Sequence, residues 1–185
     1  MLNKEFYIKN GLIYGTVNIV YLMITYVLGM DAMMSYYNVG ISILVGLGLM
    51  IYMGTQVRNE MGGFMTLGEG FKNIMVIYAL GAFLYLLANH VLATVIDPEL
   101  PSKMAQATID KTMSMMESFD VPEDQMDETY DELTSSIQKS MKDTYTIGGF
   151  IKTYFMTVAM GAIGAVIGAA ITKKENPNPF AEETH

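Results

Sequence analysis

The sequence contains no cysteine and only two histidines, His90 and His185, among 185 residues. Without a thiol, the chain cannot be lipidated on cysteine, and its redox compartment stays undetermined. The two histidines are too far apart to form a ligand pair on one helix face, and neither an HExxH motif nor a nucleophile motif is present. These absences predict a protein that is not an enzyme and that has no cofactor and no metal site.

Phosphate-binding patterns are missing as well. The glycines between Arg58 and Lys72 follow neither the GxGxxG spacing nor the Walker GxxxxGK(S/T) pattern, so nucleotide binding has little support. The only sizeable polar segment, Asp97–Tyr145, has 12 acidic residues and 4 lysines and carries the whole net charge of −8. Such a segment repels phosphates, so we expect no nucleic-acid partner.

What the sequence does contain is four long apolar windows, nearly free of charge. They are Gly11–Gly29, Val39–Thr55, Ile74–Ile96 and Ile147–Ile171, the last interrupted only by Lys152. About 20 helical residues cross the hydrocarbon core of a bilayer, where backbone groups must pair within the segment. The sequence therefore predicts an all-α fold, an integral membrane four-helix bundle with a membrane region at 1–96, an acidic insert at 97–146, a fourth span at 147–172 and a flexible tail at 173–185.

The first window also admits a second interpretation, a cleaved signal peptide, because Lys4 and Lys9 precede it. Two features oppose this. The apolar run is longer than the usual core of about 7 to 15 residues, and Met30-Asp31-Ala32-Met33 is a poor small-residue cleavage site. We therefore expect the window to be retained as a span.

Basic residues of the short connections fall on one side of the predicted membrane. They are Lys4, Lys9, Arg58, Lys72, Lys173 and Lys174. The first connection, residues 30–38, has no Lys or Arg, so the positive-inside rule places it outside the cytoplasm. Both termini are then cytoplasmic, and the insert at 97–146 lies on the opposite side.

Within the insert, apolar residues recur at helical intervals on two stretches. The first face is Leu100, Met104, Ala107, Met115 and Phe119, and the second is Met126, Tyr130, Leu133, Ile137 and Met141. Asp120 is placed to cap the second helix, with Pro122 in its first turn, and Pro101 suits the start of the first. The sequence predicts a helical hairpin, which packs its two faces together or offers the second face to a partner chain.

The apolar windows contain two amide side chains, one imidazole and one ammonium group, those of Asn18, Asn89, His90 and Lys152. Polar groups in lipid are costly and face other helices or water, so these residues are the candidate intramembrane site. Interhelical hydrogen bonding explains the asparagines, and Lys152 can extend its ammonium to the outer surface. Histidine is the side chain type most often used to carry protons, so a proton relay at His90 is the functional alternative to a structural role.

Small residues mark where helices approach closely. They are Gly11 and Gly15 in the first window, and Gly161, Gly164 and Gly168 in the fourth. Glycines four residues apart allow two backbones to touch. The same spacing serves contacts within one chain and contacts between two copies, so both alternatives stay open.

Several short motifs together resemble a known family. They are Arg58, Gly62-Gly63, Leu67-Gly68-Glu69-Gly70-Phe71, Asp97-Pro98-Glu99 and Lys173-Lys174, around a helical polar insert. Over nearly its whole length, the chain resembles the bacterial membrane proteins grouped as domain-of-unknown-function family 4199. The resemblance implies a four-span bacterial inner-membrane protein with a periplasmic insert, and it implies no activity and no catalytic residue.

Two functional hypotheses follow. The first is a non-enzymatic scaffold or accessory subunit of an envelope complex, because a plain anchor does not need two patterned helices outside the membrane. The second is a small transporter or channel component, with a polar path along Asn18, Asn89 and His90. The expected partners are the lipid bilayer and either another protein or a second copy of the chain.

Overall fold

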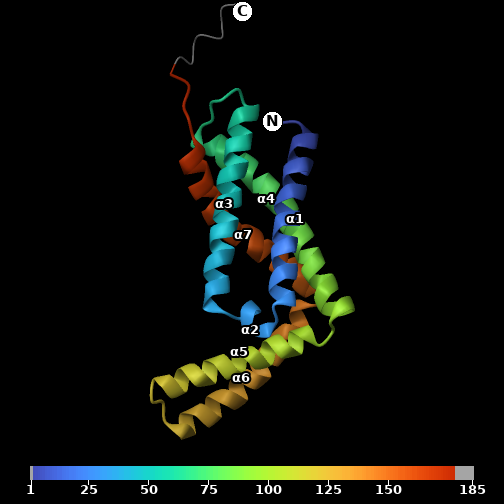
Figure 1. Ribbon diagram of the computed structural model, residues 1–185, viewed down its shortest axis with the longest axis vertical. Helices are drawn as coiled ribbons and strands as arrows, with labels where there is room; N and C mark the ends of the chain where they lie inside the picture. The colour runs from blue at the N-terminus through green and yellow to red at the C-terminus, as the bar shows by residue number, and fades with distance from the viewer. Residues whose placement is uncertain (1, 178–185) are drawn as a thin grey trace, which may run out of the picture. The chain divides into compact units, whose positions relative to one another are not determined.

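The computed structural model describes residues 2–177, apart from the side chains at positions 123, 124, 128, 138, 141 and 142. Residues 178–185, which include His185 and most of the predicted tail, lie outside the described residues. The described chain is helical (Figure 1), so the all-α prediction is confirmed. In chain order, the elements are α1 (Lys4–Val27), α2 (Met30–Met33), α3 (Tyr36–Glu60), α4 (Leu67–Val91), the π-helical turn η1 (Leu92–Ile96), α5 (Leu100–Ser118), α6 (Glu123–Thr144) and α7 (Ile147–Thr172).

Four helices are long and apolar enough to cross a membrane: α1, α3, α4 with η1, and α7. Each covers all or most of one predicted window. The short second window lengthens at both ends, to Tyr36 and Glu60, because polar flanking residues continue the helix. The first window ends two residues earlier than predicted, since Gly29 has a φ of 94° and cannot continue α1.

The chain divides into two compact units. The first unit contains Met1–Asn18, Ile41–Tyr85 and Phe155–His185, and the second contains Ile19–Gly40 and Leu86–Tyr154. Each long helix contributes one segment to each unit. We describe the two units separately.

The first unit is a bundle of four helix segments with an apolar core. Side chains with no exposed surface come from α3, α4 and α7 and include Met53, Val57, Ile77, Ala165 and Ala169. Lipid is as apolar as these side chains, so their burial from water supplies no driving force for helix association, and close van der Waals packing holds the helices together.

Glycines bring these helices into backbone contact within the chain. A Cβ atom added to Gly15 of α1 would lie 3.0 Å from the carbonyl oxygen of Gly81 in α4, and one added to Gly168 of α7 would lie 3.1 Å from that of Met50 in α3. Gly11, Gly161 and Gly164 instead face side chains, those of Leu80, Tyr78 and Met50 respectively. The glycines singled out in the sequence therefore all lie at helix contacts inside the first unit.

The connection between α3 and α4 is a tight turn tied to the end of α7. Gly62 and Gly63 have φ values of 80° and 91°, which side-chain-bearing residues rarely adopt. Beyond them, Met65 is buried and pairs with Lys174 through two backbone hydrogen bonds of 2.7 and 2.9 Å. Arg58 donates to the carbonyl oxygen of Thr172 at 3.4 Å, which joins the last turn of α3 to the end of α7.

A capping box starts α4. The backbone N–H of Thr66 donates to the Glu69 carboxylate at 2.9 Å, and the N–H of Glu69 donates to the Thr66 hydroxyl at 3.3 Å. This reciprocal pair satisfies two of the N–H groups that the first turn of a helix leaves open. The residues Thr-x-x-Glu were a readable signal that our sequence analysis missed.

The second unit is organised around Asp97, which follows η1. Its carboxylate accepts a hydrogen bond from the Tyr26 hydroxyl at 3.2 Å and pairs with the Lys103 ammonium at 3.4 Å. Partial burial acts to raise the pKa of Asp97, but the hydrogen bonds from Lys103 and Tyr26 outweigh it and leave the pKa below its ordinary value. The end of α1 is thereby joined to the start of α5.

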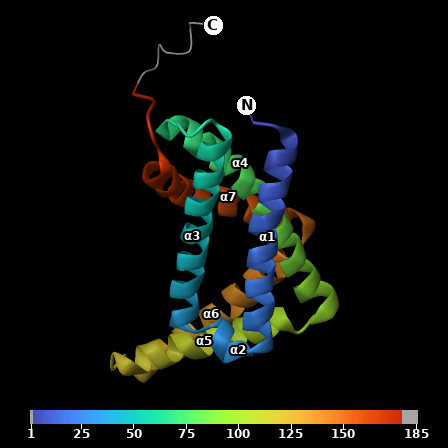
Figure 2. The ribbon, with the colours of Figure 1, turned by 45° about the horizontal axis from the view of Figure 1, so that its top comes forward.

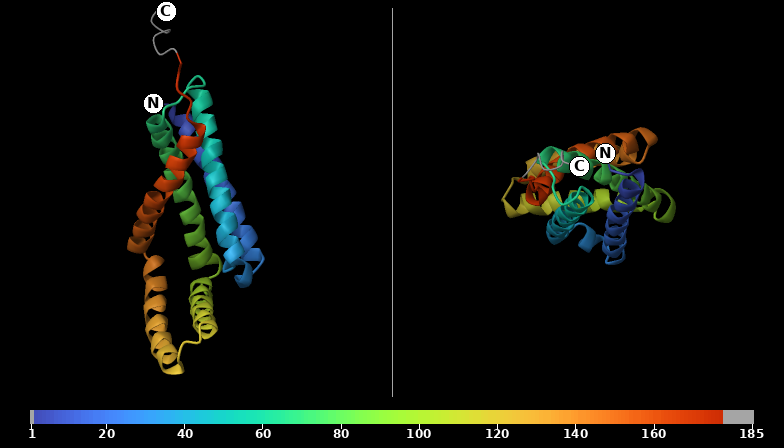
Figure 3. Two further views of the ribbon diagram at one scale, coloured as in Figure 1. Left: turned by 90° about the vertical axis from the view of Figure 1, so that its left-hand side faces the viewer. Right: turned by 90° about the horizontal axis from the view of Figure 1, so that it is seen from above.

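The helices α5 and α6 lie side by side (Figures 1 and 3). Figure 2 shows the short helix α2 beside α5. The predicted first face was partly wrong. Leu100 is buried, but the other buried residues of α5 are Ala105 and Ile109, while Phe119 is 76% exposed. The small side chain of Ala105 allows α5 to approach its neighbours more closely than Met104 and Met115, which belonged to the predicted face.

Asp120 does not cap α6 as predicted. Pro122 occupies the position before α6, with no side-chain capping bond, and Asp120 has a φ of 53°. Its N–H donates to the Glu117 carbonyl oxygen at 3.0 Å, and the N–H of Val121 donates to that of Met116 at 3.2 Å. This is a Schellman motif. Because Asp120 takes the left-handed conformation that ends α5, it cannot also adopt the extended one that begins α6.

The contact between α1 and α4 can be tested with a glycine pair. A Cβ atom on Gly81 would lie 2.8 Å from Tyr14 Cδ1 and 3.0 Å from the carbonyl oxygen of Gly11. We expect Gly81→Ala to lower the free energy of unfolding by about 1–3 kcal/mol, because the helices must move apart. Gly48 of α3 has no described atom within 4 Å of such a Cβ. Gly48→Ala should therefore be neutral or stabilise by up to about 1 kcal/mol. Equal changes in unfolding in detergent would contradict the contact.

Candidate functional site

A cavity of about 350 Å³ lies in the first unit, and all four long helices line it. Its lining residues are Tyr14 and Asn18 of α1, Ser42, Ile43, Gly46, Leu47 and Met50 of α3, Tyr78, Ala82 and Tyr85 of α4, and Thr157, Met160, Gly161 and Gly164 of α7. Pockets of about 300–1,000 Å³ with apolar walls and a few polar groups are the usual form of small-molecule sites. This cavity has that composition and contains no charged side chain.

Two tyrosines form one wall of the cavity. The rings of Tyr14 and Tyr78 meet edge to face, with centroids 5.4 Å apart. The Tyr78 hydroxyl donates to the carbonyl oxygen of Thr157 at 3.0 Å, which joins α4 to α7. The hydroxyl of Tyr78 therefore already has a hydrogen-bond partner in the protein.

Tyr14 differs, because its hydroxyl has no hydrogen-bond partner among the described residues, although the side chain is only 5% exposed. The hydroxyl oxygen is directed toward α3, where a Cβ atom on Gly46 would lie 3.9 Å from it. Among the described side chains, the enclosed polar atom without a partner is the Thr134 hydroxyl, so the Tyr14 oxygen opens onto the cavity, where water or a ligand can complete its bond. The hydroxyl of Tyr14 is therefore the polar group most open to a bound molecule.

Asn18 also lines the cavity, one helical turn from Tyr14. Its side-chain amide Nδ2 donates to the carbonyl oxygen of Tyr14 at 2.8 Å. The amide oxygen remains as an acceptor without a partner among the described residues. The cavity thus combines an O–H group from Tyr14 with an acceptor from Asn18, an arrangement that suits an uncharged molecule with both kinds of polar atom.

The other three predicted intramembrane residues lie in the second unit. The His90 ring packs against the rings of Phe150 and Tyr145, with centroids 5.7 and 6.1 Å away. Asn89 forms a side-chain hydrogen bond with Tyr145, and burial raises the pKa of the Tyr145 hydroxyl against the opposing effect of this bond. Lys152 is exposed. Asn18 therefore lines a cavity of the first unit, whereas His90 belongs to an aromatic cluster of the second.

The predicted partner face on α6 is only partly open. Met126, Leu133 and Ile137 are half-buried, and Tyr130 is 40% exposed. The side chain of Met141 lies outside the described residues. Asp127, Asp131 and Glu132 are exposed on the same helix. Among the side chains that the structure describes, no three carboxylate or histidine groups are close enough to hold a metal ion.

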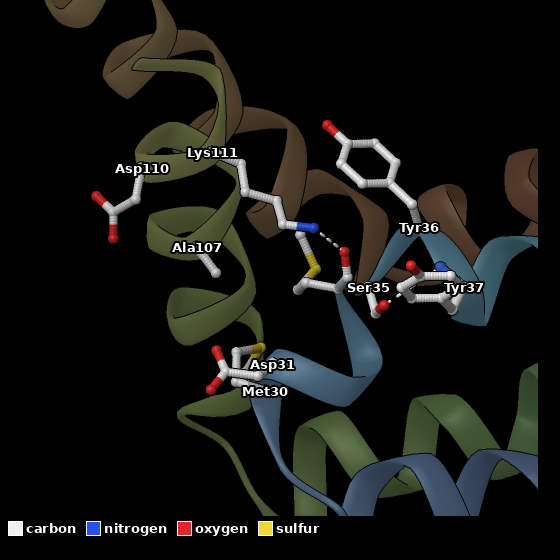
Figure 4. A pocket seen from close by; sticks show the side chains of 9 residues that line it. Met30, Asp31, Ser35, Tyr36, Tyr37, Ala107, Asp110 and Lys111 are labelled. Carbon is white, nitrogen blue, oxygen red and sulfur yellow. Dashed lines mark hydrogen bonds between the residues drawn. The ribbon is translucent and has the colours of Figure 1, made fainter. Parts of the chain in front are cut away.

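A second pocket, which the sequence analysis missed, lies in the second unit between α2, the start of α3 and α5 (Figure 4). It has a volume of about 460 Å³ and is lined by Met30, Asp31, Met34, Ser35, Tyr36, Tyr37, Ala107, Asp110 and Lys111. The Lys111 ammonium donates to the carbonyl oxygen of Met34 and lies 4.6 Å from the centre of the Tyr36 ring. No local pattern announces a contact between residues 77 positions apart in the sequence.

Comparison with known proteins produced one finding. The sequence profile of the family described as "Protein of unknown function (DUF4199)" matches residues 9–174. The match covers all four long helices except the first residues of α1, and it includes α5 and α6. No curated protein and no solved structure matched the chain.

The two tyrosines of the cavity provide a matched pair of substitutions. Tyr78→Phe removes a hydroxyl that is bonded to Thr157, so we expect it to reduce the free energy of unfolding by about 1 kcal/mol. Tyr14→Phe removes a hydroxyl without a protein partner and should leave stability unchanged within about 0.5 kcal/mol. Thermal or denaturant unfolding of both variants in one detergent measures the difference. A larger loss for Tyr14→Phe would show that its hydroxyl is bonded inside the protein.

Proposed function

The chain belongs to the DUF4199 family, and from this premise we propose that it is a non-enzymatic protein of the bacterial inner membrane that acts as a scaffold or accessory subunit of an envelope complex. Its four long apolar helices are those of a multi-pass membrane protein. In this proposal, the bundle anchors the protein and the α5–α6 pair recruits a partner.

The distribution of basic residues supports a cytoplasmic location for both termini. Lys4 begins α1, Arg58 lies in the last turn of α3, Lys72 lies in the first turns of α4, and Lys173 follows α7. All of these helix ends belong to the first unit, whereas α5 and α6 belong to the second. The positive-inside rule then assigns the basic helix ends to the cytoplasm and α5–α6 to the periplasm.

One observation carries the scaffold proposal: α6 packs along α5 and still presents an exposed acidic surface. Asp127, Asp131 and Glu132 are exposed, and Tyr130 of the same helix is 40% exposed. Like charges stacked along a helix are mildly destabilising, so they bring no benefit to the fold by themselves. Complementary charge steers association, which makes a periplasmic protein with a basic surface the fitting partner.

The cavity of the first unit favours a second candidate, a small transporter or channel component. The open hydroxyl of Tyr14 and the amide oxygen of Asn18 give an uncharged solute or a water molecule two polar contacts between the helices. His90 does not strengthen this candidate, because its ring packs between two aromatic rings in the other unit. We therefore rank it second.

The absence of cysteine makes the orientation directly testable. Single substitutions at exposed sites, Ser114→Cys in α5 and Glu175→Cys after α7, introduce one thiol each. With the outer membrane permeabilised, a membrane-impermeant maleimide should label Ser114→Cys in intact cells and label Glu175→Cys only after lysis. The reverse labelling pattern would overturn the proposed topology.

The accessory role predicts a partner that co-purifies with the protein in mild detergent from its own membranes. Mass analysis should find it in stoichiometric amount. Substituting Asp127→Asn together with Asp131→Asn should lower its recovery at physiological salt, because a complementary charge pair is lost. The control variant, Glu60→Gln with Glu175→Gln, removes the same charge from residues assigned to the cytoplasmic side and should retain the partner. A homogeneous oligomer with nothing attached would contradict the proposal and favour the second candidate.

A further inference from the structure

We propose that the pocket between α2 and α5 binds the headgroup of a zwitterionic phospholipid of the phosphatidylethanolamine class. The pocket lies at a membrane boundary, because α1 ends at Val27 and α3 begins at Tyr36, and both helices can cross a membrane. The residues between these ends, with α2 among them, are therefore at the depth of lipid headgroups. The site is independent of which side of the membrane this boundary faces.

Lys111 supplies the positive charge for a phosphate group. Figure 4 shows its side chain leaving α5 and extending toward the turn between α2 and α3. One of its N–H groups is used by the carbonyl oxygen of Met34, and the Tyr36 ring lies beneath the ammonium. An ammonium has three donors, so two remain for phosphate oxygens. The contacts to Met34 and Tyr36 hold the side chain across the pocket, which reduces the entropy lost when a phosphate binds.

Two carboxylates are available to bind the ammonium of ethanolamine, the positively charged part of the headgroup. Asp31 of α2 and Asp110 of α5 line the same pocket, and Asp110 is oriented by a 2.8 Å hydrogen bond from Gln106. A carboxylate retains further lone pairs, which can accept from the ammonium of ethanolamine. The lining has two negative charges and one positive charge, so a headgroup with a net negative charge is disfavoured and a zwitterion matches both signs.

An apolar groove in the same unit fits the rest of a lipid. It has a volume of about 390 Å³ and is lined by Ile19, Val20, Met23, Ile24 and Val27 of α1 and by Leu28, which follows α1. Leu28 is two residues before Met30, which lines the headgroup pocket. Tyr36 and Tyr37, at the edge of that pocket, are 74% and 85% exposed, as tyrosines at a membrane interface are. This apolar surface lies close in sequence to the charged pocket, which favours a lipid over a soluble phosphate ester as the occupant.

Native mass spectrometry of the delipidated full-length protein tests the proposal with three lipids that share the same acyl chains. We expect phosphatidylethanolamine to bind about tenfold more tightly than phosphatidylglycerol, whose headgroup lacks the cation, and than phosphatidylcholine, whose quaternary ammonium has no N–H donor. Soluble glycerophosphoethanolamine should fail to displace the lipid at equal concentration, because it has no acyl chain. Equal binding of the three lipids, or equal binding of the soluble compound, would overturn the proposal.

Matched variants locate the site. Lys111→Met should weaken phosphatidylethanolamine binding about tenfold, whereas Lys139→Met, at an exposed lysine of α6, should leave it unchanged. Asp31→Asn with Asp110→Asn should reduce the preference over phosphatidylglycerol to about one or reverse it, a change in selectivity that loss of folding does not produce. Unchanged affinity in Lys111→Met together with unchanged selectivity in the aspartate variant would place the lipid elsewhere.

Discussion

The absence of water inside a bilayer is the constraint from which the rest of this structure follows. Backbone N–H and C=O groups have no solvent partner there, so each crossing segment must be one uninterrupted helix. Because lipid competes equally well for apolar side chains, such helices associate through close packing. In the first unit, Gly15 meets the backbone at Gly81 and Gly168 meets it at Met50, which gives the packing that hydrophobic burial cannot supply.

Other glycines of these helices line the cavity, namely Gly46, Gly161 and Gly164. The rings of Tyr14 and Tyr78, which meet edge to face, line it as well. Of these two hydroxyl groups, that of Tyr78 donates to the carbonyl oxygen of Thr157, whereas that of Tyr14 has no partner within residues 2–177 as described. An isolated charge at this depth would be costly, so the polar groups here are hydroxyls and an amide. This chemistry favours an uncharged molecule as any ligand of the cavity.

The second unit follows different rules, because part of it lies beyond the crossing helices. Asp97 joins α1 to α5 through Tyr26 and Lys103, and Lys111 joins α5 to the turn after α2. These contacts are charged or polar, and water tolerates them where lipid does not. Placing Lys111 beside two carboxylates leaves a pocket with charges of both signs at the boundary between the two environments. The acidic side chains Asp127, Asp131 and Glu132 of α6 are exposed in the same unit.

The sequence alone determined the all-α fold, the approximate positions of the four long helices, the two helices of the insert and the glycines at helix contacts. These features depend on local composition and on a period of 3.6 residues, both of which are visible in a linear sequence. Only the tertiary structure decided that Asp120 ends α5 instead of beginning α6, that Ala105 and Ile109 form the buried face of α5, and that Lys111 reaches Met34. For Asp120 the outcome depends on which of two local conformations is more favourable, as its motif with Met116 and Glu117 shows. For Ala105, Ile109 and Lys111 it depends on which neighbours pack against them, and such contacts are not encoded by periodicity.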